Sequence, residues 1–210
     1  MLLSLPDLVR KYNLNIKGII HCGAHTGEEY PIYQKLGIDN VLWIEANRHL
    51  IPQLEKRIKN DNHLILNAVI SDEPWKKVDF IYTNQTQSSS LYHLGLNKQQ
   101  RQGLQEQTIE QVETISLDHL FKHHIDLDIK RYNLINLDIR GGELNALRGF
   151  KNCLKHIDYI YCEAHIKETY KNVPQLDDLL NLLNPLGFKL KDSYFYKNKG
   201  WGDIFLIREI

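Results

Sequence analysis

The sequence predicts an α/β fold in which helices cover both faces of an open, mostly parallel sheet with an antiparallel strand at its C-terminal end. Three observations support this prediction. Short apolar segments alternate with helical ones along the 210 residues. The apolar segments are nearly continuous, which is typical of strands buried on both faces of a parallel sheet. The last two, FKLKDS and DIFLIREI, are joined by a connection too short for a crossover helix, so they should pair antiparallel.

The first third of the chain supplies a short helix and three strand-like segments. MLLSLPDLVRKYNL reads as an amphipathic helix, and KGIIHCGAH as a strand that leads into a loop and a helix over 28–36. VLWIEA forms the second strand, after which Asn47 can cap a helix that runs towards Ile58. Residues 64–70 read as a third strand. This order is that of strand–helix–strand units in a parallel sheet.

The middle of the chain is more polar. Val78, Phe80 and Tyr82 alternate with polar residues, which indicates a hairpin strand. Residues 97–111 contain six glutamines and little apolar surface. This composition favours a mobile excursion, either a loop or a loosely held helix, that could cover an acceptor site.

The C-terminal half returns to the strand–helix pattern. YNLINLDI is an apolar strand, Gly141 and Gly142 turn the chain into a helix that Gly149 ends, and HIDYIYCEA is the next strand. Four leucines then share one face of a helix that Pro185 cannot continue: Leu176, Leu179, Leu180 and Leu183. Ligands of such sheets bind at the C-terminal strand ends, where the strand order reverses.

Composition excludes several classes of protein. The 26 basic and 26 acidic residues cancel, so bulk binding to nucleic acid or to an anionic membrane is not expected. No apolar run reaches the roughly 18–20 residues of a membrane span, and the N-terminus lacks the features of a signal peptide. Cys22, Cys153 and Cys162 show no paired spacing, which argues against a disulfide framework or a zinc cage and favours a cytoplasmic protein with reduced thiols.

The first strand ends in a loop suited to a ligand. Gly23 and Gly27 allow the backbone to approach a ligand closely, and Glu45, at the end of the second strand, can accept both hydroxyls of a ribose. A dinucleotide fingerprint would need glycine where this chain has His25, so a ribose ligand without pyrophosphate, such as S-adenosylmethionine, fits better than NAD. The alternative is an ordinary tight turn beside a surface glutamate. Asp72 either contacts the adenine side of the ligand or is a turn residue.

Taken together, these segments resemble the FkbM-type methyltransferases, a class I family that depends on S-adenosylmethionine. The matching pieces are IIHCGAHTGEE, VLWIEAN, NAVISDE, the run Ser88–Ser90, ISLDHL, NLINLDIRGGELNALRGF, YIYCEA and WGDIFLI. The resemblance covers about residues 19–207, and LDIRGGELNALRG is its most specific part. It implies a Rossmann-like, seven-stranded sheet, formed by a single domain over 19–210 with a polar insertion at about 84–111, after a short helical segment over 1–18.

The resemblance also implies a function and a set of site residues. It implies that S-adenosylmethionine is the methyl donor, with S-adenosylhomocysteine as product, and that a sugar hydroxyl of a glycan or glycosylated metabolite is the acceptor. Ser88 and Ser89 match a serine pair on a loop that faces the cofactor, and His21 stands where many members have Asp. The residues expected at the cofactor are His21, Gly23, Ala24, Gly27, Glu45, Ala46, Asp72, Ser89 and Asp138.

Arg140 departs from the family, which usually has Glu or Gln at this position. Because side chains alternate along a strand, Arg140 should point to the same side as Asp138 and pair with it. Such a pair would lower the pKa of Asp138 and make it a poorer base. Arg140 then either grips an anionic part of the acceptor or the cofactor carboxylate, or reflects lost or altered activity.

The expected catalytic residues are Asp138, Glu163 and His165, all at strand ends, where a general base could activate an acceptor hydroxyl. A metal-assisted variant with Asp138, Glu163 and Asp203 lacks any short-range ligand spacing, so no metal is expected. Trp201 could stack on a sugar face or cover the sheet edge. Two alternatives stay open at this point: a methyltransferase that acts on a non-sugar metabolite, and a cofactor-binding protein without turnover.

Overall fold

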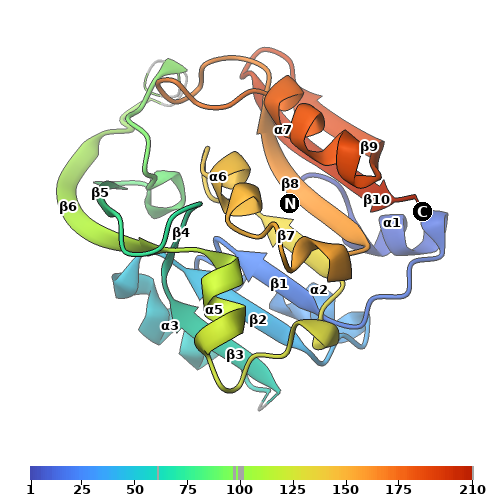
Figure 1. Ribbon diagram of the computed structural model, residues 1–210. Helices are drawn as coiled ribbons and strands as arrows, with labels where there is room; N and C mark the ends of the chain where they lie inside the picture. The colour runs from blue at the N-terminus through green and yellow to red at the C-terminus, as the bar shows by residue number, and fades with distance from the viewer. Residues whose placement is uncertain (61, 97, 99–101, 210) are drawn as a thin grey trace.

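The computed structural model of the chain (Figure 1) describes residues 1–60, 62–96, 98 and 102–209. At its centre is a seven-stranded sheet with the order β3-β2-β1-β7-β8-β10-β9. Neighbouring strands from β3 to β8 run parallel, whereas β10 runs antiparallel to both β8 and β9. The strands are β1 (Ile19–Cys22), β2 (Val41–Glu45), β3 (His63–Asn67), β7 (Leu134–Leu137), β8 (Tyr159–His165), β9 (Phe188–Tyr196) and β10 (Trp201–Arg208). The predicted α/β sheet with a reversed C-terminal strand is therefore confirmed.

Helices pack on both faces of this sheet (Figure 1). Alternate residues of β1 explain why both faces are apolar: Ile19 packs with the side that carries α2 and α3, and Ile20 with the side that carries α5, α6 and α7. The helices are α1 (Leu5–Tyr12), α2 (Tyr30–Lys35), α3 (Ile51–Arg57), α5 (Leu117–His123), α6 (Glu143–Arg148) and α7 (Leu176–Leu183). Burial of both faces is what a nearly continuous apolar strand requires.

Local sequence signals fix several helix ends. The side chain of Ser4 accepts a hydrogen bond from Asp7 N at the start of α1, and Asn47 accepts from His49 N before η1 (Arg48–Leu50), which leads into α3. Gly149 ends α6 as expected, and it has a second constraint. A Cβ there would lie 2.3 Å from Ser71 O, so the turn packs directly on the neighbouring backbone.

A second, three-stranded sheet has the order β4-β6-β5, with β4 (Val69–Ile70), β5 (Lys77–Thr83) and β6 (Glu106–Ile115). The single strand predicted over 64–70 is wrong, because β3 and β4 belong to different sheets. Ala68 lies between them and donates its N–H to Glu45 O, the last ladder bond to β2, after which Val69 pairs with Thr114. The chain therefore leaves the seven-stranded sheet and joins the three-stranded sheet within one residue.

The polar excursion predicted over 97–111 is only partly a loop. Residues 106–111 belong to β6, which pairs antiparallel with the predicted hairpin strand β5. Backbone hydrogen bonds to β5 stabilise this polar strand, so it needs little apolar burial of its own. Residues 97 and 99–101 of the excursion lie outside the described residues.

The connection between β5 and β6 returns over the strand ends of the main sheet. It contains η2 (Thr86–Ser88), and Ser90 forms a bridge with Ile81. A small buried cluster of Leu94, Leu104, Tyr170 and Val173 fixes the connection against the loop that follows β8. This places residues 86–91 opposite the ends of β1, β2 and β7. None of the helices in the described ranges is both long and apolar enough to cross a bilayer.

Candidate functional site

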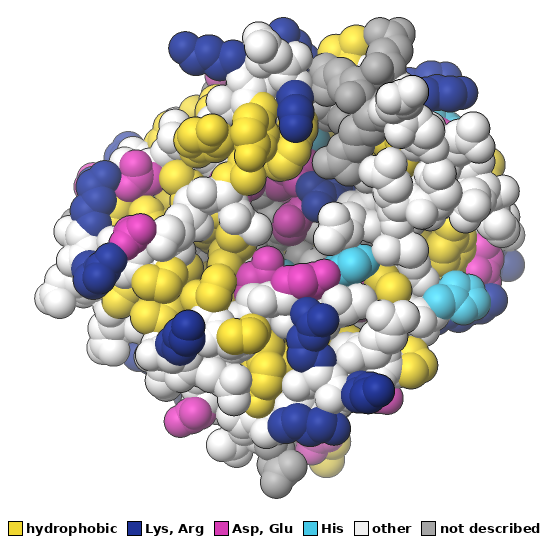
Figure 2. All heavy atoms as spheres, turned by 180° about the vertical axis from the view of Figure 1, so that it is seen from behind, with side chains coloured by type: hydrophobic (Ala, Val, Ile, Leu, Met, Phe, Trp, Pro, Cys, Tyr) yellow, Lys and Arg dark blue, Asp and Glu magenta, His cyan; other side chains and the backbone are white. Residues whose placement is uncertain are grey.

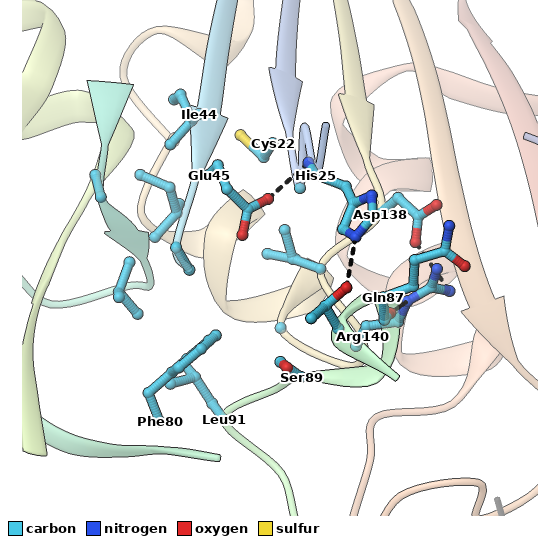
Figure 3. Close-up of a pocket in the computed structure, with 18 of the residues that line it drawn as sticks. Cys22, His25, Ile44, Glu45, Phe80, Gln87, Ser89, Leu91, Asp138 and Arg140 are labelled. Carbon is cyan, nitrogen blue, oxygen red and sulfur yellow. Dashed lines mark hydrogen bonds and ion pairs between the residues drawn. The ribbon is translucent and has the colours of Figure 1, made fainter. Parts of the chain in front are cut away.

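A cavity of about 300 Å³ opens at the C-terminal ends of β1, β2 and β7 (Figure 3). The loops after these strands form one wall, β4 and Phe80 of β5 form another, and residues of the 86–91 connection close it. Acidic side chains gather at a hollow in the surface (Figure 2), and four carboxylates line the cavity: Glu28, Glu29, Glu45 and Asp138. The position agrees with the strand-end site expected for this fold.

Gly23 brings two strand ends into contact. It has a φ of 87°, and a Cβ at this position would lie 2.0 Å from Asp138 O. Only glycine fits there, because both the left-handed backbone and the close approach exclude a side chain. Gly27 also has a positive φ, but it faces Leu54 and Ile58. Gly27 and the buried Ala24 support the loop without lining the cavity.

Glu45 is held by two backbone amides at the wall of the cavity. Its Oε2 accepts from His25 N at 2.7 Å, and its Oε1 accepts from Asn47 N at 2.7 Å. Burial raises the pKa of Glu45, whereas these two hydrogen bonds favour the charged form. Each carboxylate oxygen keeps acceptor capacity beyond the backbone bond, so Glu45 can still receive hydroxyl groups from a ligand. Its neighbour Ala46 also lines the cavity.

Arg140 links two acidic side chains at the other end of the cavity. Its Nη1 lies 3.0 Å from Asp138 Oδ1 and forms a second ion pair with Glu163, while its Nε donates to Gln87 O at 2.7 Å. Burial raises the pKa of Asp138, but the charge of Arg140 and a hydrogen bond with Glu163 together outweigh that effect, and the net pKa is lower than usual. Burial also raises the pKa of Glu163 well above its ordinary value, against the charge of Arg140.

The predicted pairing of Arg140 with Asp138 is confirmed, but the predicted reason is wrong. The strand β7 ends at Leu137, so neither residue lies within it. Arg140 instead adopts a left-handed backbone with a φ of 56°, which turns its side chain back over the strand end. Such a conformation is uncommon for a residue other than glycine and is concentrated at functional sites.

Glu143 is a site residue that the sequence analysis missed. Its carboxylate accepts from Ile139 N and from Gly141 N, both at 2.9 Å. These bonds fix the turn that carries Asp138 and Arg140, and burial raises the pKa of Glu143 to about 7. A Glu directly after Gly-Gly, at the first position of a helix, was the signal that could have revealed it.

Glu163 and His165 lie behind the cavity wall. Only 3% of Glu163 and 1% of His165 is exposed, and neither lines the cavity. His165 Nδ1 lies 2.7 Å from Thr169 Oγ1, and its Nε2 lies 3.5 Å from Glu163 Oε1. Burial, assisted by the charge of Arg140, lowers the pKa of His165 to about 4. Of the three expected catalytic residues, only Asp138 reaches the cavity.

The remaining predicted residues divide between the wall and the interior. Ser89 lines the cavity, and its Oγ accepts from Thr83 N at 3.2 Å. His21 does not line it, because its ring is buried beside Tyr33 and Trp43 on the other face of the sheet. Asp72 does not line it either, and its carboxylate accepts from Ser71 Oγ.

The other candidate residues at the strand ends have internal partners. Asp203 accepts a hydrogen bond from Tyr161 Oη, and the ring of Trp201 packs on Tyr196 with centroids 5.2 Å apart. In the described part of the chain, no group of three or more His, Cys, Asp or Glu side chains is arranged to hold a metal ion. Asp138, Glu163 and Asp203 therefore do not form the metal-ligand set considered from the sequence.

Two further cavity residues, His25 and Gln87, were not singled out from the sequence. His25 lies two residues after Gly23 and has a φ of 48°, and its ring points from the β1–α2 loop towards the 86–91 connection (Figure 3). Gln87 contributes its backbone carbonyl to Arg140. His25 lies within the matching piece IIHCGAHTGEE, but its contact with Thr86, like that of Gln87 with Arg140, joins segments that are distant in sequence.

Comparisons with known proteins agree with this fold. A model of the methyltransferase FkbM domain matches residues 21–190. No curated protein matches the chain in sequence. Among solved structures, the chain is similar to an S-adenosylmethionine-dependent methyltransferase from Mesorhizobium loti, with a TM-score of 0.53 and 11% identity over 98% of this chain and 97% of that one.

Two other solved structures show the same fold. One is the putative methyltransferase yhhF from Escherichia coli, with a TM-score of 0.52 and 12% identity over 98% of this chain and 82% of that one. The other is magnesium protoporphyrin IX methyltransferase from Synechocystis PCC 6803 with bound S-adenosylmethionine, with a TM-score of 0.50 and 10% identity over 97% and 76% of the two chains.

Proposed function

Because this chain belongs to the family of FkbM methyltransferase domains, we propose that it uses S-adenosylmethionine to methylate a hydroxyl of a sugar, in a glycan or a glycosylated metabolite. The observation that carries the proposal is the cavity at the strand ends, with Glu45 at one end and Asp138 at the other. The first side chain suits the ribose of the donor, and the second suits the hydroxyl of an acceptor.

The cavity fits this donor in charge and in shape. Four carboxylates line it against two cations, the guanidinium of Arg140 and the amino group of Met1, so its field favours a cation and disfavours a pyrophosphate. S-adenosylmethionine is such a cation, and it supplies a sulfonium methyl group that is already electrophilic. Gly23 lets the donor approach the loop backbone, and Glu45 accepts the ribose hydroxyls.

Asp138 is the residue that we assign to the acceptor. It lines the cavity and 27% of its side chain is exposed, while Arg140 Nη1 lies 3.0 Å from its Oδ1. A partly exposed carboxylate at the cavity can orient a sugar hydroxyl and take up its proton. The lowered pKa of Asp138 makes it a weak base, so most of the rate enhancement is expected from alignment of the hydroxyl, which contributes up to roughly 7–11 kcal/mol.

The choice of a sugar as acceptor rests on the family resemblance and on the polarity of the wall near Asp138. Ser89, Gln87 and Arg140 lie on this side of the cavity and offer donors and acceptors to several hydroxyl groups. Proteins of the same fold act on unrelated acceptors, since one similar structure is a porphyrin methyltransferase. The fold therefore does not select the acceptor, and the local side chains must do so.

A second candidate function follows from Arg140. Its guanidinium pairs with both Asp138 and Glu163, which would block a base if the pairs persisted during turnover. A protein of this kind would bind the donor without transferring the methyl group. Restored transfer in Arg140→Gln or Arg140→Glu, in which the cation is removed, would support this alternative.

The experiment that tests the proposal uses the purified protein, methyl-labelled S-adenosylmethionine and the nucleotide-sugar and glycan pool of its host. Mass spectrometry is expected to find the label on a sugar oxygen. Label on a non-sugar metabolite would overturn the choice of acceptor. Donor binding measured by calorimetry, without transfer to any component, would favour the binding protein.

A further inference from the structure

Two side chains from the strand-end loops hold the segment that closes the cavity. His25 Nε2 lies 2.9 Å from Thr86 Oγ1, and Arg140 Nε donates to Gln87 O at 2.7 Å (Figure 3). Both residues have left-handed backbones, with φ values of 48° and 56°. The 86–89 segment is therefore attached at its start to the β1–α2 loop and at its centre to the loop after β7.

His25 also contacts the donor side of the cavity. Its backbone N–H donates to Glu45 Oε2 at 2.7 Å, and its Nδ1 lies 2.7 Å from Glu28 Oε1. One residue thus joins the proposed ribose acceptor, a second carboxylate and the 86–89 segment. A left-handed backbone at a residue other than glycine costs free energy. This cost is smaller for histidine, asparagine and aspartate than for most other residues.

The contacts define how the ring is oriented. Because the acceptor at Nδ1 is a carboxylate, Nδ1 donates to Glu28, and Nε2 is the ring nitrogen that contacts the Thr86 hydroxyl. Each ring nitrogen has one partner, so the ring cannot rotate without losing both. The position of Thr86 is therefore coupled to the position of the loop that presents Glu45.

We propose that His25 is a positioning residue, through which binding of the donor at Glu45 fixes the 86–89 segment and prepares the acceptor side of the cavity. This inference rests on the proposed function, because it takes Glu45 as the ribose acceptor and Gln87 and Ser89 as part of the acceptor wall. Donor and acceptor sites that share such a segment are linked, and each ligand strengthens the binding of the other by the same factor.

Hydrogen–deuterium exchange of the peptide over 84–91 tests this coupling, with S-adenosylhomocysteine as the probe. In the unmodified protein, the probe is expected to slow exchange of this peptide by about tenfold, within the usual range of coupling between sites. Thr86→Val removes the hydroxyl, keeps the shape of the side chain and leaves the contacts of His25 with Glu45 and Glu28 in place. In this variant the slowing is expected to disappear, while the affinity for the probe changes less than about twofold.

Two further variants sharpen the test. Thr26→Val is the matched control, because Thr26 Oγ1 donates to Glu28 Oε1 at 3.0 Å and does not contact the 86–89 segment, so the slowing should persist. His25→Asn keeps a residue that tolerates the left-handed backbone but cannot reach both partners of the ring, so it should behave like Thr86→Val.

Three outcomes would overturn the inference. The slowing could persist in Thr86→Val, or the bound probe could fail to slow exchange in the unmodified protein. Thr86→Val could also lose probe affinity by more than about tenfold, which would place Thr86 in the donor site itself. Absence of probe binding in calorimetry is a different result. It would contradict the proposed function before the coupling is measured.

Discussion

Arg140 and Asp138 form an ion pair at the end of β7, with Nη1 and Oδ1 3.0 Å apart, and the same nitrogen contacts Glu163. Two carboxylates therefore share one cation. The side chain of Glu163 is only 3% exposed, whereas that of Asp138 is 27% exposed and reaches the cavity. Arg140 thus compensates an interior acid and an acid of the site at once, which makes it important for both stability and chemistry.

Arg140→Gln is expected to destabilise the protein by about 3–5 kcal/mol, because it leaves Asp138 and the buried Glu163 without the cation that both contact. The double variant Arg140→Gln/Glu163→Gln should recover at least half of that loss, since it removes the uncompensated acid as well. Urea unfolding measures both values. Arg10→Gln is the control: Arg10 pairs with Asp7 at the surface, and its loss should cost less than about 1 kcal/mol. Equal stability of Arg140→Gln and the unmodified protein would contradict the prediction.

Glu45→Gln is expected to weaken binding of S-adenosylhomocysteine by roughly 10- to 100-fold, because hydrogen bonds to a charged group are worth about 1.5–3 kcal/mol. The side-chain amide of the glutamine would also point an N–H group at a backbone N–H, where the carboxylate of the unmodified protein accepts a hydrogen bond. Calorimetry measures the affinity. Asp72→Asn should leave it unchanged, because Asp72 does not line the cavity. A loss of affinity in Asp72→Asn would revive the sequence-based assignment of Asp72 to the adenine side.

Gly23→Ala is expected to destabilise the protein by more than about 2 kcal/mol and to abolish donor binding, because the added Cβ would lie 2.0 Å from Asp138 O and the backbone is left-handed. The strand ends of β1 and β7 would have to separate. Gly37→Ala isolates the cost of the backbone, since Gly37 also has a positive φ but no atom within 4 Å of an added Cβ. Its cost should be about 1–2 kcal/mol, with donor binding retained. Similar behaviour of the two variants in thermal unfolding would show that the close contact is unimportant.

The sheet and its strand ends could be predicted from the sequence because their signals are local. Apolar strands separated by helices predict a parallel sheet, and Glu45 follows from its position at the end of β2. Features of the fold that depend on contacts between distant segments could not be predicted in this way. β6 is polar and is stabilised by its backbone pairing with β5, and the change of sheet at Ala68 depends on a bond to Glu45 O.

The candidate site, like the fold, combines features that could be predicted from the sequence with features that could not. A pairing of Arg140 with Asp138 could be expected from two residues close in sequence, although the left-handed turn that produces it could not. Contacts between residues distant in sequence, such as that of His25 with Thr86, leave no local signal. His21 was assigned to the cofactor from the family resemblance, but strand alternation directs it to the opposite face, where Tyr33 and Asn136 contact it.

The buried ring of His165 makes stability depend on pH. Burial lowers the pKa of His165 to about 4 in the folded protein, from an ordinary value of 6.5. Between these two values the unfolded chain binds a proton that the folded protein does not bind, so folding becomes less favourable as the pH falls. This contribution is complete above about pH 6.5 and is lost progressively towards pH 4, up to about 3 kcal/mol.

His165→Gln tests this dependence, because glutamine can still hydrogen-bond Thr169 but does not titrate. The difference in unfolding free energy between the unmodified protein and His165→Gln, measured with urea at several pH values, should shift in favour of the variant as the pH falls from about 7 to about 4.5. Comparing the two proteins removes the contribution of the carboxylates that they share. His123→Gln, at an exposed position at the end of α5, is the control for the loss of a histidine outside the core. A constant difference between His165→Gln and the unmodified protein would mean that the pKa of His165 is the same in the folded protein as in the unfolded chain, and would return it to the candidates for proton transfer.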